Sequence, residues 1–178
     1  MNTKTALTML AAAVLLAACQ TTPDDPLRAS AQLKPTKGNK TFGEVTFEQM
    51  GDKVRVQAVV QGLKPGGEYG FHIHEVGDCS SGDGMSAKGH FNPVGKPHGH
   101  YSSAERHAGD LPALKAPLKG NKRGRAKLLV DLDTISVEPG PGNIIGRGVI
   151  VHAGPDDYRT QPTGNAGARL ACGVIRAE

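Results

Sequence analysis

The sequence predicts an all-β protein: a Greek-key antiparallel β-sandwich or barrel of about eight strands with two long functional loops. Short stretches of alternating apolar and polar residues recur along the chain, and turn-forming residues separate them. Glycine and proline are abundant, with 24 and 12 residues, and no segment has a convincing helical period. This composition suits short strands joined by turns better than packed helices.

Strand signals are frequent from Ser30 onward. Residues 43–50 alternate apolar and polar side chains, and Met50-Gly51-Asp52-Lys53 is typical of a hairpin turn into a second strand at 54–60. Another turn at 64–67 precedes a predicted strand at 68–75, and the later strands are expected at 124–132, 146–152 and 169–175.

Two long stretches between these strands, 77–112 and 153–168, show no periodicity and are rich in turn formers. A structureless segment of such length is uncommon in a compact domain unless something organises it. Metal ligands and a disulfide would provide that organisation.

The N-terminus has the features of an export signal. Lys4 is followed by an apolar run, 6–16, that is too short to span a bilayer as a permanent helix. Leu16-Ala17-Ala18-Cys19 resembles the lipobox of bacterial lipoproteins, which implies cleavage before Cys19 and lipid attachment to it. The alternative is a plain secretory signal. We therefore divide the chain into a signal peptide (1–18), a polar tether (19–29) and one domain (30–178), and expect a periplasmic protein anchored through Cys19 to the outer membrane.

The cysteine count agrees with export. If Cys19 carries lipid, Cys79 and Cys172 remain, and an oxidising compartment favours a disulfide between them over two free thiols. The formal charge of +4 is too mild to indicate a nucleic-acid partner, and no aromatic residues stand among the basic ones to stack bases.

Six of the seven histidines fit two metal-binding groups. His72 and His74 occupy positions i and i+2 of a predicted strand, so both face one side, roughly 6.5 Å apart. With His90 and His152 they offer four nitrogens, a set that suits copper. A second set has three nitrogens and one carboxylate oxygen, which suits zinc: His90, His98, His107 and Asp110. His90 is needed twice, and His100 is an alternative to His98.

Five motifs in order resemble the copper–zinc superoxide dismutases of the bacterial periplasm, from about Ala29 to the C-terminus. The motifs are Phe71-His72-Ile73-His74, Gly89-His90-Phe91-Asn92-Pro93, Arg106-His107-Ala108-Gly109-Asp110-Leu111, Gly146-Arg147-Gly148-Val149-Ile150-Val151-His152 and Arg169-Leu170-Ala171-Cys172-Gly173-Val174-Ile175. The resemblance implies conversion of superoxide to oxygen and hydrogen peroxide by a redox-cycling copper beside a structural zinc.

The same resemblance implies a role for each site residue. Copper would bind His72, His74, His90 and His152, and zinc would bind His90, His98, His107 and Asp110. His90 would bridge the metals and relay a proton, and Arg169 would attract the anionic substrate. Asp156 would accept hydrogen bonds from ligands of both metals, although Asp157 is adjacent. Cys79 would pair with Cys172, and Lys88 is a candidate for the rim of the site.

One rival function needs the same ligands: a non-catalytic periplasmic protein that buffers copper or zinc. Such a protein would need neither Arg169 nor a histidine that closes both ligand sets, so the sequence favours the enzyme. The pattern leaves the oligomeric state open between monomer and homodimer.

Overall fold

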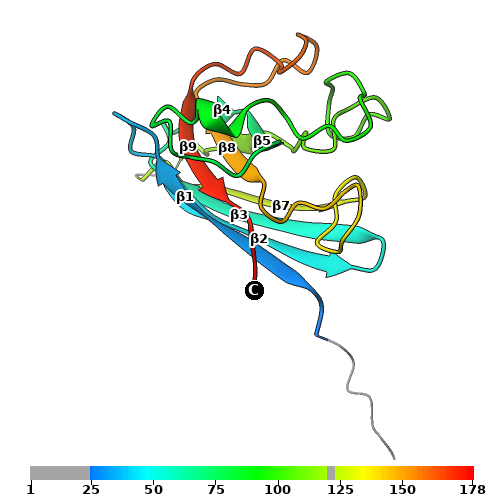
Figure 1. The fold of residues 1–178 in the computed structure, drawn as a ribbon. Helices are drawn as coiled ribbons and strands as arrows, with labels where there is room; N and C mark the ends of the chain where they lie inside the picture. The colour runs from blue at the N-terminus through cyan, green and yellow to red at the C-terminus, as the bar shows by residue number, and fades with distance from the viewer. Residues whose placement is uncertain (1–24, 120–122) are drawn as a thin grey trace, which may run out of the picture.

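The computed structural model describes residues 25–119 and 123–178, and in them the chain forms ten strands and one short 3-10 helix (Figure 1). The predicted signal peptide, Cys19 and the first part of the predicted tether lie outside the described residues. In chain order the elements are β1 (Arg28–Pro35), β2 (Phe42–Met50), β3 (Lys53–Gln61), β4 (Glu68–Tyr69), β5 (Phe71–His74), η1 (Met85–Ala87), β6 (Leu114–Lys115), β7 (Ala126–Leu132), β8 (Gly148–His152), β9 (Arg169–Val174) and β10 (Arg176–Ala177).

Most strands belong to one curled antiparallel sheet in the order β5-β8-β9-β1-β2-β3-β7, with β10 beside β1 (Figure 1). The chain crosses from β3 to the far half of the sheet before β7 returns to pair with β3, which is a Greek-key connection. The predicted all-β fold is confirmed. None of the helices within 25–119 and 123–178 is long and apolar enough to cross a membrane.

The core lies inside the curl and follows the two-residue period of the strands. In β3, the side chains of Val54, Val56, Ala58 and Val60 are buried, whereas those of the residues between them are more exposed. From the other half of the sheet, Phe71 of β5 reaches the same cluster. Each buried aliphatic or aromatic side chain contributes about 1.5–3 kcal/mol. The site described below therefore stands on a rigid scaffold.

The prediction of a single strand over 68–75 is wrong, because the chain changes sheets at Gly70. β4 pairs with β6, whereas β5 pairs with β8. The N–H of Gly70 donates to the carbonyl of Gly154 (2.8 Å), and its carbonyl accepts from His152 N (2.8 Å). A Cβ at position 70 would lie 2.7 Å from the Cβ of Ala166, so only glycine fits this crossing.

The first strand begins earlier than the sequence indicated. β1 starts at Arg28, inside the segment predicted as tether, and pairs there with Glu48 of β2. An ion pair joins Arg28 Nη2 to Glu48 Oε1 at 2.9 Å, and the carbonyl of Arg28 accepts from Glu178 N. The small residues that alternate in β1 give only a weak strand signal in the sequence. Pairing with β2 on one side and β10 on the other orders the segment.

Candidate metal centre

The first two histidines lie on β5 with both side chains fully buried. Phe71 and Ile73 alternate with them and enter the core, as the strand period predicts. β8 pairs with β5 on one side and with β9 on the other, and its register with β9 shifts between Val151 and His152. Such an irregularity re-aims the side chain at the end of a strand. His152 thereby faces the same space as the two histidines of β5.

Two pieces of the long loop after β5 run along that strand and bring in further ligands. Isolated β-bridges pair His72 with Asp110 and His74 with His90. Ile73 lies between them, donating from its N–H to the carbonyl of Gly109 and accepting from Phe91 N, both at 2.9 Å. The loop is thus held by backbone bonds to the strand that carries the first ligands.

One group of four imidazoles forms where β5, β8 and this loop meet. It consists of His72, His74, His90 and His152, with one ring nitrogen of each within 4.8 Å of the others. The Nε2 atoms of His74 and His152 are 3.4 Å apart. His72 Nδ1 and His90 Nε2 are buried and have no hydrogen-bond partner. Buried polar atoms normally have a partner, so these two unpartnered nitrogens fit the binding of a cation.

Hydrogen bonds at the far side of the rings fix which nitrogen faces the group. His74 Nδ1 lies 2.8 Å from the carbonyl oxygen of Lys88, and His152 Nδ1 lies 3.1 Å from that of Gly167. A carbonyl only accepts, so each Nδ1 carries the proton and each Nε2 keeps its lone pair for a metal.

The second group contains three imidazoles and one carboxylate: His90, His98, His107 and Asp110. Asp110 Oδ1 lies 2.9 Å from His90 Nδ1, 3.0 Å from His98 Nδ1 and 3.5 Å from His107 Nδ1. Ligands about 2.0–2.1 Å from a tetrahedral zinc ion stand about 3.3 Å apart, which matches these separations. The donor set and its spacing fit zinc.

His90 belongs to both groups through opposite nitrogens. Its Nδ1 faces Asp110 at 2.9 Å, and its unpartnered Nε2 faces the four-imidazole group. The ring also stacks on that of His72, with centroids 3.9 Å apart. The buried ring of His90 therefore lies between the two groups and offers one nitrogen to each.

Asp156 connects the two groups a second time. Its Oδ2 accepts from His72 Nε2 (2.7 Å) and its Oδ1 from His98 Nε2 (2.9 Å). The neighbouring Asp157 bonds instead to its own loop, through Thr160. A Cβ at Gly164 would collide with Asp156 Oδ1 and lie 2.6 Å from His98 Nε2, so the loop needs glycine there. The carboxylate of Asp156 thus orients His72 in one group and His98 in the other.

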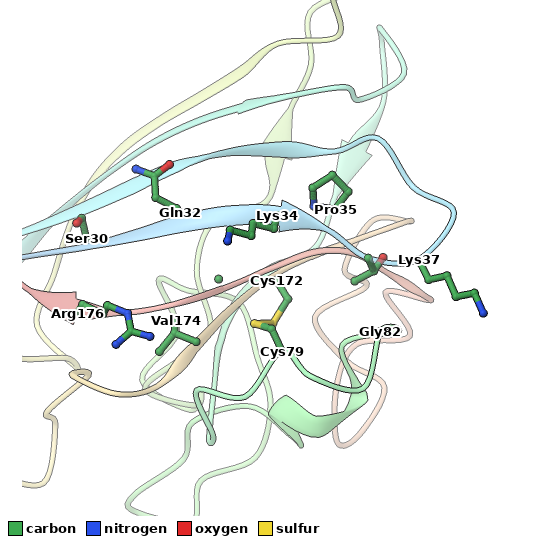
Figure 2. A pocket seen from close by; sticks show the side chains of 12 residues that line it. Ser30, Gln32, Lys34, Pro35, Lys37, Cys79, Gly82, Cys172, Val174 and Arg176 are labelled. Atoms are coloured by element: carbon green, nitrogen blue, oxygen red, sulfur yellow. A yellow bond between two sulfur atoms is a disulfide. The ribbon is translucent and has the colours of Figure 1, made fainter.

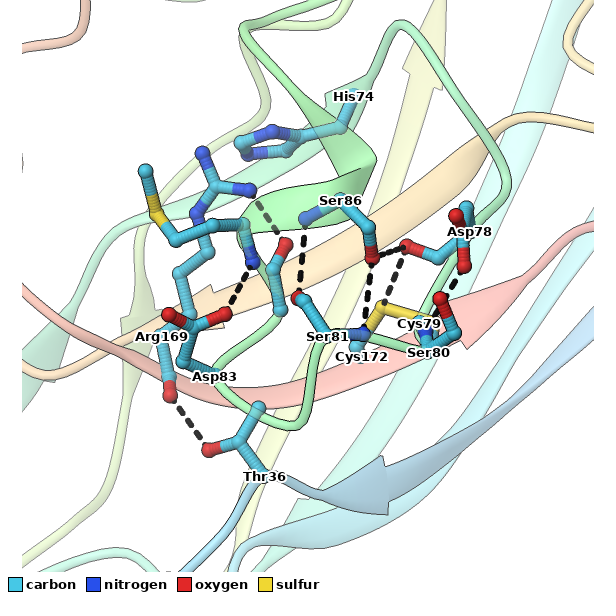
Figure 3. Close-up of a disulfide and its surroundings, with 12 residues drawn as sticks. Thr36, His74, Asp78, Cys79, Ser80, Ser81, Asp83, Ser86, Arg169 and Cys172 are labelled. Carbon is cyan, nitrogen blue, oxygen red and sulfur yellow. Dashed lines mark hydrogen bonds between the residues drawn. A yellow bond between two sulfur atoms is a disulfide. The ribbon is translucent and has the colours of Figure 1, made fainter.

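Arg169 borders the four-imidazole group at the start of β9, where it pairs with His152. Its Nη1 donates to the carbonyl of Gly84 (2.6 Å) and its Nη2 to that of Lys88 (2.5 Å), as Figure 3 shows in part. Lys88 has a φ of 59° and a ψ of −144°, which is unfavourable for a residue with a Cβ. This backbone conformation lets the carbonyl of Lys88 accept hydrogen bonds from both Arg169 and His74.

The loop that supplies these carbonyls is anchored by a disulfide between Cys79 and Cys172 of β9 (Figure 3). The predicted disulfide is present. Around it, Ser86 Oγ donates to the carbonyl of Asp78 (2.8 Å), and Ser81 and Ser86 exchange backbone-to-hydroxyl bonds. The segment from the disulfide to Lys88 is therefore internally braced, and it holds Arg169 in place.

Comparisons with known proteins agree with this geometry. The profile of the family described as "Copper/zinc superoxide dismutase (SODC)" matches residues 41–175. This chain belongs to that family. It is 39% identical over 172 residues to "Superoxide dismutase [Cu-Zn] 2" of Aquifex aeolicus, covering 94% of this chain and 96% of the relative. It is 42% identical to the "Extracellular superoxide dismutase [Cu-Zn]" of Haemonchus contortus, covering 76% and 74%.

A solved structure has the same fold. The structure titled "Crystal Structure Analysis of the clock protein EA4" superposes with a TM-score of 0.75 and 43% sequence identity, over 85% of this chain and 95% of that one. With the two ligand groups present, the chain is a superoxide dismutase whose cofactors are copper and zinc. The rival interpretation as a non-catalytic metal-buffering protein is not supported.

The structure brings together every residue that the sequence assigned to the two groups, and it leaves His100 outside both. His100 Nδ1 lies 2.7 Å from Ser102 Oγ, and its ring contacts those of Tyr101 and Tyr158. Sequence reasoning missed the carbonyls of Lys88, Gly167 and Gly84. Backbone acceptors leave no signature in residue identity, so no sequence signal could have found them.

The pKa shifts of the ligand side chains are consistent with metal binding. Burial lowers the pKa of His72 to about 3 and that of His152 to about 4, so both rings are neutral at pH 7. Burial acts to raise the pKa of Asp110, but its hydrogen bonds to three histidines outweigh that effect and lower the pKa. His98 differs: burial opposes its charge, yet Asp110 and Asp156 raise its pKa to about 9. Metal-free His98 is therefore protonated at pH 7.

Asp156→Asn will weaken binding of both metals about 10–100-fold, because the loss of the negative charge weakens the hydrogen bonds to both imidazoles and only one amide oxygen remains to accept them. Competition with a chelator, followed by metal analysis of the protein, measures this loss. Asp157→Asn is the matched control and will keep wild-type affinity. A loss confined to one metal would contradict the proposed link between the groups.

Zinc binding to the metal-free protein at pH 7 will release about one proton from His98, because Nδ1 must lose its proton to bind the ion. Calorimetric titrations in buffers with different ionisation enthalpies will give apparent heats that differ accordingly. The release will disappear above about pH 9, where His98 is already neutral. Heats that do not depend on the buffer at pH 7 would refute this assignment.

Proposed function

We propose that copper occupies the four-imidazole group and zinc the group that contains Asp110, with His90 between them. Four nitrogen donors suit copper, and three nitrogens with one carboxylate oxygen suit zinc. The observation that supports this most strongly is at His90: Nδ1 faces Asp110, while Nε2 is buried without a protein partner. A neutral imidazole has only one lone pair, so a ring that serves both groups must give up its second proton.

Bound copper would supply a one-electron couple for superoxide, and the chain's residues do the rest. Arg169 presents a guanidinium beside His74 and His152. Burial is the main cause that lowers the pKa of both rings, and the charge of Arg169 adds to it. A fixed positive charge in this position raises the local concentration of a small anion. When the ring of His90 is held through Nδ1 alone, Nε2 would carry a proton and could pass it to the bound anion.

We further propose that the chain is an exported periplasmic lipoprotein, anchored through Cys19 to the outer membrane. The apolar run 6–16 and Leu16-Ala17-Ala18-Cys19 support this, and the Cys79–Cys172 disulfide suits an oxidising compartment. The choice between monomer and homodimer stays open.

The metal assignment is tested by crystals of the protein loaded with both metals. Anomalous scattering on either side of the copper and zinc absorption edges will locate copper beside His90 Nε2 and zinc beside His90 Nδ1. A superoxide-consumption assay on the same preparation connects occupancy to activity. An oxidised crystal in which the ring of His90 contacts neither ion, or only one, would overturn the proposal.

Arg169→Ala will retain both metals but slow turnover by about tenfold at low ionic strength, because the fixed charge that attracts superoxide is lost. Its rate will also depend less on salt than that of the wild type. Arg169→Lys is the matched variant and will recover much of the salt dependence. Unchanged kinetics of Arg169→Ala at low ionic strength would exclude the attraction role.

Cys19→Ala will abolish incorporation of labelled palmitate into the protein in a bacterial host and will move it from the membrane fraction to the soluble periplasmic fraction. The dismutase activity of the released protein will be unchanged, because Cys19 precedes β1, the first strand of the domain, in the sequence. Membrane association that survives this substitution would reject the anchor.

A further inference from the structure

A hollow of about 640 Å³ lies on the outer face of the sheet (Figure 2), and no metal ligand is among the residues that line it. Its floor is formed by outward-facing residues of β1, β9 and β10, and the disulfide loop forms one wall. Both cysteines of the disulfide line it, together with Gly82. The volume lies in the range of ordinary ligand pockets.

The sheet itself creates this hollow. β1 pairs with β10 at Ser30 and Arg176, and with β9 at Lys34 and Cys172. Between those pairs the ladder is interrupted, because β9 ends at Val174 before β10 begins. The hollow lies over this interruption, and Val174 lines it opposite β1.

Three cationic side chains line the hollow: Lys34, Lys37 and Arg176 (Figure 2). All three residues are exposed, and no aspartate or glutamate is among the lining residues. Within residues 25–119 and 123–178, none of the three charged groups makes an ion pair or side-chain hydrogen bond. Elsewhere on the sheet, Arg28 and Arg55 do have carboxylate partners. Unpaired cations around a concave surface favour an anionic occupant.

The spacing of these cations distinguishes between kinds of anion. Arg176 stands opposite Ser30, four residues along β1 from Lys34, and Lys37 lies three residues further on. Four residues of an extended strand span about 13 Å, so the backbone positions from which these cationic side chains extend are well separated along the hollow. Between them lie Val174, Pro35 and Gln32, whose amide donates to the Glu44 carboxylate of β2. A linear ligand with separated negative charges and apolar side chains matches this surface.

We propose that the hollow is a docking site for an extended acidic peptide segment of a partner protein. Its carboxylates would pair with Lys34, Lys37 and Arg176, and its apolar side chains would pack on Val174 and Pro35. The bound segment would cover the Cys79–Cys172 disulfide and shield it from thiols. This inference does not depend on the proposed function, because no metal ligand lines the hollow.

The test uses the full metal-loaded protein and a fluorescent peptide of about eight residues in which Glu and Val alternate at every second position, with Ser between them. Successive side chains of an extended chain point to opposite faces, so this spacing places both Glu and Val on the face that meets the hollow. Anisotropy will show saturable binding at low salt that is at least tenfold weaker for Lys34→Glu. Lys127→Glu on β7, beyond β2 and β3, is the matched charge control and will bind like the wild type. The peptide will also slow reduction of the disulfide by dithiothreitol in the wild type.

Several results would overturn the proposal. Equal weakening by Lys127→Glu would show attraction to net charge only. Binding of a Gln-Val peptide as tight as that of the Glu-Val peptide would remove the role of the cations. If inorganic phosphate displaced the labelled peptide at the same concentration as unlabelled peptide does, the hollow would be a simple anion site. If the protein bound phosphatidylglycerol vesicles but not the peptide, the hollow would be a lipid site. Lys34→Gln, checked by thermal unfolding, guards against misfolding of the charge-reversed protein.

Discussion

The sharing of the His90 ring between two groups of ligands is the constraint on which the rest of the structure depends. Its two nitrogens point in opposite directions, so the distance between the groups is set by the width of one imidazole. The bridge with His74 and the hydrogen bond to Asp110 fix the ring. Because its surroundings are buried, a small displacement would affect both groups together. The scaffold must therefore hold strand and loops in one mutual arrangement.

That arrangement is achieved by cross-links between segments that would otherwise be too long to order. Asp156, from the loop after β8, accepts from ligands on β5 and on the loop after it. The disulfide attaches the segment after β5 to β9. In addition, Gln161 exchanges bonds with the backbone of His98, at 2.8 and 2.9 Å. Each long loop is thus tied to the other and to the sheet, which explains how so much irregular chain can build a buried site.

The sequence predicted the all-β fold and grouped the ligands because those features reside in side-chain identity and two-residue periodicity. His72 and His74 are an example: their spacing alone placed both on one strand face. The strand over 68–75 was predicted wrongly because the change of sheet at Gly70 depends on contact with Ala166, nearly a hundred positions away. The early start of β1 was missed because pairing with β2 and β10 overrides its weak pattern. The carbonyl acceptors were unpredictable, since every residue has one.

The carbonyl of Lys88 has a consequence for how this enzyme can change over time. It is the shared acceptor of His74, a candidate copper ligand, and of Arg169, the candidate substrate attractant. A substitution that rotates this one peptide plane alters both at once, so the two properties cannot drift separately. Neighbouring positions such as Met85, which is 59% exposed, are free to vary. Evolutionary adjustment of the entrance is therefore confined to side chains, while the main chain beneath them stays fixed.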